Sequence, residues 1–522
     1  MLFLMLRLVK INDFRYLCAQ HQSWNTHTVK PCFLSTLFWR RHVGSLLLPL
    51  LLGACSALQY QPLRSIDHIN PEEGYRLQTA AQHKYMANKD DDVLMILMFS
   101  GGGTRAAAFG YGVLEEMNRQ QVRIGNKTGG LAEHVDLVYG ISGGSVLAAY
   151  YGLHGPAVIP EFERRFLSQN FQKVLMQQVF SVSNWPRLTS PQFGRGDLLQ
   201  EQLDLQLFHG ATYDDLLHRR KGPFVVISAT DMTLGTRLDF LQEYFDVLCV
   251  DLTDMPVSRA VAASSAVPMV FSPLTLNNHG GQCGYHLSPE LAEAAAEANG
   301  GRLNTKQSYV RIVRQYENSQ KRPYIHLLDG GLTDNLGLRS LLDATEVYNR
   351  DTLYQQFAPG KVRKVVLINV NAQTQMSQDI DASADVPGFG AVLNAVVNIP
   401  IDRYSHETQL QFQQYIDSLN QQRSADDPTL YFISVNLLDL PSSPLRDRVA
   451  RIPTTFYLPR EDVRNLKAAA GTLLNGSSEY QRLLHDLRTR PVNDVPESAA
   501  ASAVAASEIA APAIAASAPV TK

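Results

Sequence analysis

Three glycine-rich turns hold the residue types that acyl-transfer chemistry needs. The first covers residues 100–105 and leads into a helical pattern that runs to about Asn118. Backbone N–H groups of consecutive glycines can point into one concavity, and the start of the following helix adds positive potential. The turn lacks the Gly-Lys-Ser/Thr ending of a Walker loop and the G-x-G-x-x-G pattern of a dinucleotide site. It predicts an oxyanion site, with a simple tight turn as the alternative, at Gly101, Gly102 and Gly103.

The second turn holds a serine in the pattern G-x-S-x-G. Ser142 lies between Gly140 and Gly144, directly after the apolar run 135–139 and before a helical stretch at 146–151. Small flanking residues permit the sharp strand-to-helix bend that exposes a nucleophilic serine oxygen. A serine that only caps a helix is the alternative, because G-x-S-x-G also occurs by chance.

The third turn holds a carboxylate. Asp329 follows the apolar run 324–328 and precedes Gly330 and Gly331. At the carboxyl end of a strand, this carboxylate can face the same crevice as Ser142 and take the serine proton. The alternative is a plain turn, in which Asp-Gly is common.

The elements that must position these turns are alternating strands and helices. Short apolar runs separated by helical patterns are typical of a parallel sheet covered on both faces. Residues 161–220 and 286–320 show no strand pattern and indicate helical insertions, while 429–435 could add a strand. We therefore expect a three-layer α/β fold with ligand sites at the carboxyl ends of the strands. The predicted strands are 93–99, 135–139, 224–229, 324–328 and 365–370.

The composition indicates a globular protein and excludes several kinds of ligand. Of the 522 residues, 45% are hydrophobic and 19% are charged, which is enough apolar material for a sizeable core. The net charge is -3, from 47 basic and 50 acidic residues, and no basic block is present, so nucleic acid is a poor partner. The five cysteines form no C-x-x-C pair. We expect neither a metal nor a cofactor.

The three turns together resemble the motifs of the patatin-like phospholipases, in the same order along the chain. That family has a glycine-rich turn ending in arginine (here 101–105), then G-x-S-x-G (140–144), then Asp-Gly-Gly (329–331). Residues 263–273 resemble the family's Ala-Ser-x-Ala-x-Pro segment. The resemblance spans about residues 93–340. It implies a three-layer α/β/α patatin-like fold with a mostly parallel central sheet and helical insertions.

The resemblance implies a serine-aspartate dyad that works without histidine. Ser142 would be the nucleophile and Asp329 the base, and hydrolysis would pass through an acyl-enzyme. Because an unperturbed aspartate is a weak base, we expect a partly desolvated site that raises its pKa. The oxyanion donors would be the N–H groups of Gly101, Gly102 and Gly103. Support for the motifs would come from Arg105, Gly140, Gly144, Gly330 and Gly331.

Two positions depart from the family pattern without changing a reactive group. Many members have glycine where this chain has Ala106, and alanine where it has Gly143.

A histidine triad is the alternative to the dyad. His326 precedes Asp329 by three positions on the same predicted strand, so its side chain should point to the opposite face. The sequence does not place His154, His279 or His286. Each is more often a surface or core histidine than a triad member.

The resemblance implies a serine acyl-ester hydrolase of phospholipids or lysophospholipids, with a lipid substrate and a membrane surface as its partners. The sequence points to no protein partner. The alternative is a non-catalytic lipid-binding or envelope-assembly module on the same fold. Intact Ser142 and Asp329 argue against that module.

The N-terminal region carries an export signal. A pair of arginines precedes the apolar run 43–52, which is too short to cross a bilayer. Residues 52–55 resemble the lipobox of bacterial lipoproteins, which implies acylation of Cys55. Ser56 in place of aspartate favours sorting to the outer membrane. We therefore expect an exported protein that is lipid-anchored on the periplasmic side of a bacterial outer membrane, with an ordinary cleaved signal or a buried helix as the alternative.

The chain divides into regions by composition. About 40 residues precede the apolar run, so we expect translation to begin near Leu34 or Leu37. The regions are 1–54 (signal, with an over-extended start), 55–92 (tether to the anchor), 93–345 (catalytic core), 346–490 (continuation of the fold with a candidate lid helix) and 491–522 (disordered Ala/Ser/Pro tail).

Two further features have alternative interpretations. Cys249 and Cys283 could pair in an oxidising compartment or remain two buried thiols. Residues 386–397 carry apolar side chains at helical spacing. We expect a core helix there first, and a lid or interfacial helix second.

Overall fold

The near-continuous apolar runs form the strands of one eight-stranded sheet, with the order β10-β9-β1-β4-β5-β8-β7 and β6 paired to β5. Neighbours from β10 to β5 run parallel, whereas β6, β7 and β8 are antiparallel to their neighbours. A short hairpin, β2 (Gln121–Ile124) and β3 (Lys127–Gly130), stands apart from the sheet. The sheet strands are β1 (Val93–Phe99), β4 (Leu137–Ile141), β5 (Phe224–Asp231), β6 (Thr236–Asp239), β7 (Leu274–Asn277), β8 (Tyr324–Leu328), β9 (Lys364–Asn371) and β10 (Thr429–Asn436).

The computed structural model describes residues 62–77, 91–297, 304–347, 362–374, 378–424 and 427–488. All of them belong to one unit, Leu58–Lys522. The signal region, Cys55 and the predicted C-terminal tail lie outside the described residues. Every predicted strand is present, including the extra one at β10, and the predicted α/β/α class is confirmed.

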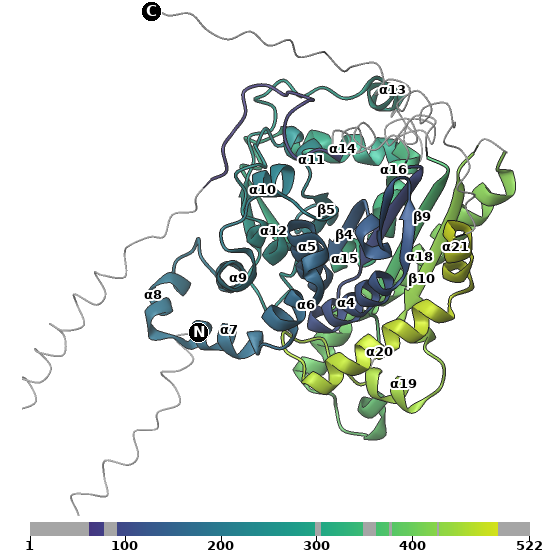
Figure 1. Cartoon of the computed structure of the whole chain (residues 1–522). Helices are drawn as coiled ribbons and strands as arrows, with labels where there is room; N and C mark the ends of the chain where they lie inside the picture. The colour runs from purple at the N-terminus through teal and green to yellow at the C-terminus, as the bar shows by residue number, and fades with distance from the viewer. Residues whose placement is uncertain are drawn as a thin grey trace, which may run out of the picture. The chain divides into compact units, whose positions relative to one another are not determined.

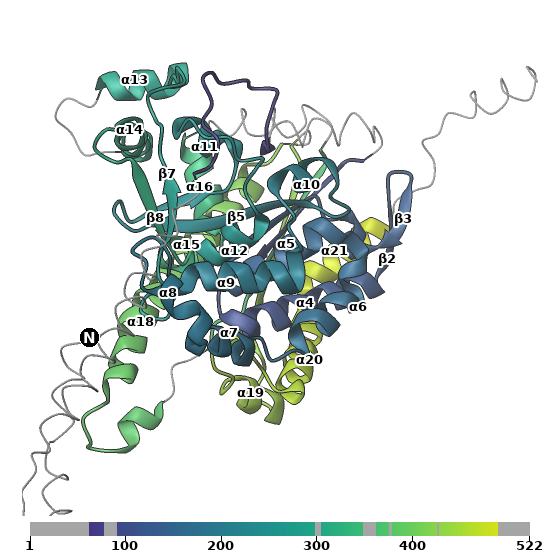
Figure 2. The ribbon, with the colours of Figure 1, turned by 90° about the vertical axis from the view of Figure 1, so that its left-hand side faces the viewer.

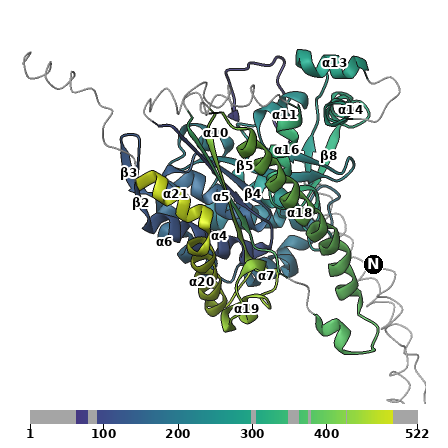
Figure 3. The same cartoon turned by 90° about the vertical axis from the view of Figure 1, so that its right-hand side faces the viewer.

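Helices cover both faces of this sheet (Figure 1). On one face lie α4 and α5. α4 packs closely against β1, because a Cβ added to Gly110 of α4 would lie 2.7 Å from the ring of Phe99 on β1. This face also carries α12, α20 and α21. On the other face lie α11, α14, α16 and the long α18, which crosses the view in Figure 3. The bounds are α4 (Gly103–Arg119), α5 (Gly143–His154), α11 (Gln242–Val247), α12 (Val257–Ser264), α14 (Thr305–Glu317), α15 (Gly331–Asp334), α16 (Leu338–Val347), α18 (Phe389–Gln422), α20 (Arg460–Gly476) and α21 (Ser478–Arg488).

The two predicted insertions are helical, as expected. They contain α7 (Phe171–Phe180), α8 (Trp185–Leu188), α9 (Arg195–Leu203), α10 (Tyr213–His218) and α13 (Pro289–Glu297) in addition to α14. α6 (Val158–Phe162) overlaps the start of the first insertion, and α19 (Pro444–Val449) lies later in the chain. None of the described helices is both long and apolar enough to cross a membrane.

Part of the segment expected to be a tether packs into the core instead. Tyr75 is fully buried, and its hydroxyl donates to the Val225 carbonyl and accepts from the Val225 N–H. Next to it, Arg76 forms a buried ion pair with Asp246 at 2.7 Å. Residues 62–77 therefore stabilise the edge of the domain around β5.

Strand β8 differs from the expectation of a parallel strand. It runs antiparallel to β5, with Leu328 opposite Thr230 and Leu327 opposite Asp231. Because β8 pairs with β5 only through its last residues, its end still overlaps the carboxyl end of β5. The residue after β8, Asp329, therefore reaches the edge at which the parallel strands β1 and β4 end.

Candidate active site

Ser142 lies in a strained turn between β4 and α5. Its backbone has φ 50° and ψ -124°, a conformation that a non-glycine residue adopts only when its surroundings impose it. The flanking glycines fit tight spaces. A Cβ added to Gly140 would lie 2.6 Å from the Cα of Ser145, and a Cβ added to Gly144 would lie 2.5 Å from the Phe99 carbonyl oxygen. These glycines let the turn seat against β1 and α5.

Ser142 and Asp329 are hydrogen-bonded to each other. The Ser142 Oγ donates to the Asp329 Oδ2 at 2.7 Å, and both side chains are buried. The other carboxylate oxygen of Asp329, Oδ1, accepts the Gly331 N–H at 2.8 Å. Burial raises the pKa of Asp329 to about 6, although the hydrogen bonds from Gly331 and Ser142 oppose the rise. The buried carboxylate is thus more basic than an exposed aspartate.

Ser264, at the end of α12, joins the two turns that hold this pair. Its side-chain oxygen accepts the backbone N–H of Ser142 at 2.8 Å, and its carbonyl accepts the N–H of Gly330 at 3.0 Å. The Asp329 N–H in turn donates to the Ala266 carbonyl. β4 and β8 are separated in the sheet by β5. Ser264 therefore fixes the relative position of turns that no direct strand pairing connects, which sequence reasoning missed.

The glycine-rich turn lies against Ser142, but its N–H groups are not equivalent. An added Cβ on Gly101 would lie 3.3 Å from the Ser142 Cβ. The Gly101 N–H donates to the Asn335 carbonyl at 3.2 Å, so the expectation that it serves as an oxyanion donor does not fit this structure. The N–H groups of Gly102 and Gly103 bond to no described residue, and both residues have positive φ. They remain the candidate donors of this turn.

A third candidate donor was missed at the sequence level. Gly143 is the first residue of α5, and its N–H bonds to no described residue. The residue after the nucleophile commonly supplies an oxyanion donor in G-x-S-x-G turns, a signal that could have identified it. A Cβ on Gly143 would overlap the Gly103 carbonyl oxygen, which explains the glycine at this position. The first turns of α4 and α5 thus converge on Ser142.

The remaining motif residues support the turns. Arg105 is buried and donates from Nε to the Ala372 carbonyl at 2.9 Å and from Nη1 to the Ile452 carbonyl at 2.8 Å. Burial lowers the pKa of Arg105 to about 10, and the nearby Asp402 opposes this effect. An added Cβ on Gly330 would overlap the Ser228 carbonyl oxygen, and one on Gly331 would lie 3.1 Å from the Asp329 Oδ1.

Histidine is not among the hydrogen-bond partners of Ser142 or Asp329 in the described part of the chain. The His326 ring instead lies 3.1 Å from the Thr275 hydroxyl on β7. His154 packs against a tyrosine ring at the far end of α5, where burial lowers its pKa. The described residues also contain no group of histidine, cysteine and acidic side chains that could hold a metal.

The cysteine alternatives are resolved in favour of pairing. Cys249 and Cys283 form a disulfide with their Cα atoms 5.5 Å apart. Cys55 lies outside the described residues, and its acylation stays a prediction from the sequence.

The segment 386–397 is not a core helix, so the first expectation for it is wrong. Phe389 is 75% exposed and Val396 is 65% exposed, and the buried residues of α18 begin only at Ser405. Figure 2 shows the first half of α18 extending away from the sheet. The apolar stripe faces solvent because this half of the helix extends beyond the sheet that it would otherwise cover.

This exposed half of α18 ends next to the catalytic edge of the sheet. Asp402 interacts electrostatically with Arg105, the last residue of the first motif. Preceding it, residues 386–401 contain no charged side chain. An uncharged, exposed helix therefore borders the turns that hold Ser142.

Comparisons with known proteins identify the domain. Residues 97–342 match the family model described as patatin-like phospholipase. The comparison with curated proteins gave no match. Among solved structures, the chain is similar to human GIVD cytosolic phospholipase A2, with 13% identity and a TM-score of 0.41, covering 83% of this chain and 68% of that chain. It is also similar to VipD from Legionella pneumophila, with 13% identity and a TM-score of 0.30, covering 76% of this chain and 67% of that chain. The patatin-like phospholipase model therefore covers residues 97–342, and the mostly parallel sheet with helices on both faces has the patatin fold.

Proposed function

We propose that this protein is a serine acyl-ester hydrolase of phospholipids or lysophospholipids. The observation that carries the proposal is the 2.7 Å hydrogen bond from the Ser142 Oγ to a buried Asp329 whose pKa is raised to about 6. A patatin-like phospholipase domain supports lipid acyl hydrolysis as the reaction class.

The first half of the reaction follows from this hydrogen bond. The Ser142 oxygen attacks the ester carbonyl carbon while its proton moves to the Asp329 Oδ2. The carbonyl oxygen becomes an oxyanion, which the N–H groups of Gly102, Gly103 and Gly143 are available to stabilise. When the tetrahedral intermediate collapses, the carbon–oxygen bond to the alcohol breaks. Protonated Asp329 gives its proton to that alcohol, and the acyl group stays on Ser142.

The second half reverses these roles with water. Asp329 takes a proton from a water molecule, whose oxygen attacks the acyl carbon. The Ser142 oxygen leaves, recovers the proton from Asp329, and a fatty acid is released. Because the Asp329 pKa is about 6, the carboxylate is mostly ionised near pH 7, as both proton abstractions require.

Substrate at a lipid surface fits the surroundings of the site. The exposed, uncharged half of α18 borders the catalytic edge, and an apolar helix of this kind can bury its side chains in the acyl region of a bilayer. We include this helix in the proposal as an interfacial element that brings Ser142 to the lipid.

The export signal and lipobox support a location on the periplasmic side of an outer membrane, with Cys55 as the anchor. The Cys249–Cys283 disulfide also supports export, because disulfides persist in oxidising compartments.

Release of fatty acid from phosphatidylcholine vesicles and lysophosphatidylcholine micelles tests the proposal. Ser142→Ala should remove release from both. Ser265→Ala is the matched control, since Ser265 is equally buried nearby and its hydroxyl has no hydrogen-bond partner among the described residues. It should retain activity. Wild-type protein that binds these lipids but releases no fatty acid would favour a non-catalytic module instead.

A further inference from the structure

A large apolar cavity lies on the face of the sheet opposite α4 and α5. Its volume is about 1200 Å³. The floor is made by side chains in register across four strands. One row joins Leu430, Val365 and Leu94, and the next joins Leu367, Ile96 and Leu137. The side chains along each strand alternate between the two faces of the sheet, so every second residue of these buried strands points into the cavity.

Helices form the walls and roof of the cavity without filling it. The lining side chains are mostly aliphatic and aromatic, and several are only half-buried, among them Tyr309 and Ile312 of α14, and Tyr415 and Leu419 of α18. The cavity is partly open to solvent, so its apolar lining is exposed to water, and covering that surface with an apolar ligand would be favourable. The cavity is somewhat larger than most pockets for small ligands, and its mostly apolar lining is typical of sites that bind apolar molecules.

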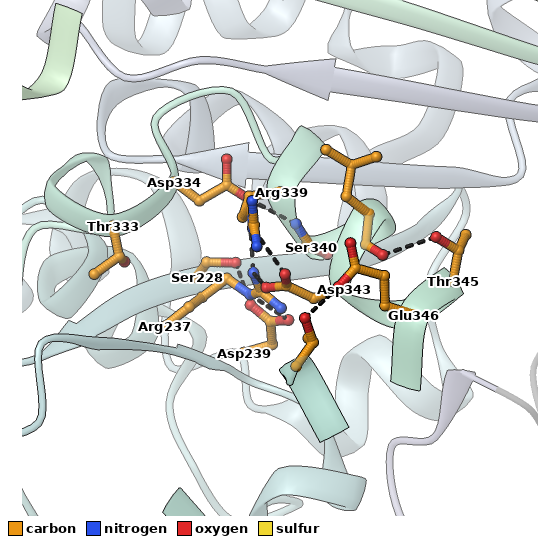
Figure 4. Close-up of polar contacts among 12 residues, drawn as sticks. Ser228, Arg237, Asp239, Thr333, Asp334, Arg339, Ser340, Asp343, Thr345 and Glu346 are labelled. Carbon is orange, nitrogen blue, oxygen red and sulfur yellow. Dashed lines mark hydrogen bonds and ion pairs between the residues drawn. The ribbon is translucent and has the colours of Figure 1, made fainter. Parts of the chain in front are cut away.

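The cavity is separate from the dyad. Neither Ser142 nor Asp329 lines it. The lining comes close to the Asp329 turn at Leu332 and Thr333 of α15. A group of charged side chains also lines the cavity, and Figure 4 shows the polar contacts among these side chains. Arg237 pairs with Asp239 at 3.1 Å and with Asp343 at 3.4 Å. These charges satisfy one another and leave the apolar floor as the main binding surface.

Among the described residues of the lining, one cation has no such partner. Arg403 of α18 forms no ion pair or hydrogen bond with a described residue and is exposed at the rim. Arg339, also on the lining, is already paired with Asp343 at 2.7 Å. Glu407, one turn further along α18, lines the same rim and disfavours a head group with more than one negative charge.

From this arrangement we propose that the cavity binds a single-chain lipid, with its hydrocarbon chain on the floor of the sheet and a singly anionic head group at Arg403. A fatty-acid carboxylate and the phosphate of a lysophosphatidylcholine share this chemistry. Both contain a long chain that would fill the apolar space and an anion that would form charge-assisted hydrogen bonds with the guanidinium. The site goes beyond the proposed hydrolysis, since binding here requires no turnover at Ser142.

Photo-crosslinking locates the ligand in the intact chain. A palmitate analogue with a diazirine in its chain is bound to the Ser142→Ala protein, irradiated, and mapped by peptide mass spectrometry. We expect crosslinks on the peptides of α14 and α18 that carry residues 309–316 and 412–419. Crosslinks confined to the peptides that carry Ser142 or Asp329 would overturn the proposal. Because this protein cannot turn over, the outcome is independent of whether the chain is a hydrolase.

Binding constants test the chain pocket. In the Ser142→Ala background, Ile312→Trp places a large side chain in the cavity and should raise the Kd for palmitate about tenfold or more. The matched control is Gln315→Trp, which adds the same ring on the exposed side of α14 and should change the Kd less than about twofold. Equal effects of the two variants would contradict the pocket.

The head-group assignment is tested with three ligands. Arg403→Gln should weaken palmitate and lysophosphatidylcholine about tenfold, because each loses a charge-assisted hydrogen bond. Hexadecanol has the same chain without the anion and should bind both proteins alike. Palmitate weakened alone would identify the fatty acid as the ligand, and lysophosphatidylcholine weakened alone would identify the phospholipid product. Equal weakening of hexadecanol, or no change with any ligand, would overturn the role of Arg403.

Discussion

Replacing Asp329 by asparagine should greatly slow catalysis and at the same time stabilise the folded protein. The asparagine side chain can keep both local contacts, because its oxygen can accept the Gly331 N–H and its amide can donate to Ser142. What it removes is a buried negative charge. Loss of the base should lower the hydrolysis rate by about 10²–10⁴-fold.

The size of the stabilisation follows from the pKa of Asp329. Burial raises that pKa from 3.8 to about 6. Each pKa unit corresponds to about 1.4 kcal/mol, so the ionised carboxylate costs the folded state about 3 kcal/mol. The folded state binds the proton more tightly than the unfolded state. The wild type therefore loses this stability as the pH rises from 3.8 to about 6, and bears the full cost above that range.

Urea unfolding at pH 8 and at pH 4 measures this directly. At pH 8 the variant should be more stable than wild type by about 3 kcal/mol, and at pH 4 the difference should nearly vanish. Asp334→Asn is the matched control, because burial likewise raises the pKa of Asp334 to about 6, but this residue does not contact Ser142. It should keep its hydrolytic activity. An Asp329→Asn protein that is less stable than wild type at pH 8, or equally stabilised at both pH values, would refute the reasoning.

Three other predictions concern the dyad, the exposed helix and the anchor. Combining Ser142→Ala with Asp329→Asn should lower the rate no further than Ser142→Ala alone, because the two groups act as a unit, as a comparison of the single and double variants would show. Val396→Asp should leave the urea midpoint unchanged, since Val396 is 65% exposed. It should reduce hydrolysis of vesicles and leave hydrolysis of short soluble esters unchanged. A sharp drop in stability together with the loss of all activities would contradict an interfacial helix. Cys55→Ala should release the protein from membranes, and a variant that still pellets with membranes after a salt wash would show that the anchor lies elsewhere.

The strands that position the site could be predicted because their signal is local. β1, β4 and β5 are buried along their whole length, so they appear in the sequence as continuous apolar runs. β2, β3, β6 and β7 were missed because each is only four residues long. The antiparallel direction of β8 was also not predictable, since an apolar run does not encode direction.

The partners within the site depend on contacts that are distant in the sequence. The three turns indicated Ser142 and Asp329 as candidates, and the structure brings them within hydrogen-bonding distance. The bond from Gly101 to Asn335 and the role of Ser264 were not predictable, because both join residues that are distant in the sequence and meet only in the folded chain. The first half of α18 was misjudged because an apolar stripe looks the same in sequence whether it faces a core or solvent.

Covalent labelling tests the central claim, that Ser142 is a nucleophile activated by Asp329. The protein is treated with a long-chain alkyl fluorophosphonate, and the adduct is followed by intact mass and mapped by peptide sequencing. We predict one adduct on Ser142 in the wild type, none in Ser142→Ala, and labelling slowed by about 10²–10⁴-fold in Asp329→Asn. An adduct on another residue, or labelling of Asp329→Asn at the wild-type rate, would contradict the dyad.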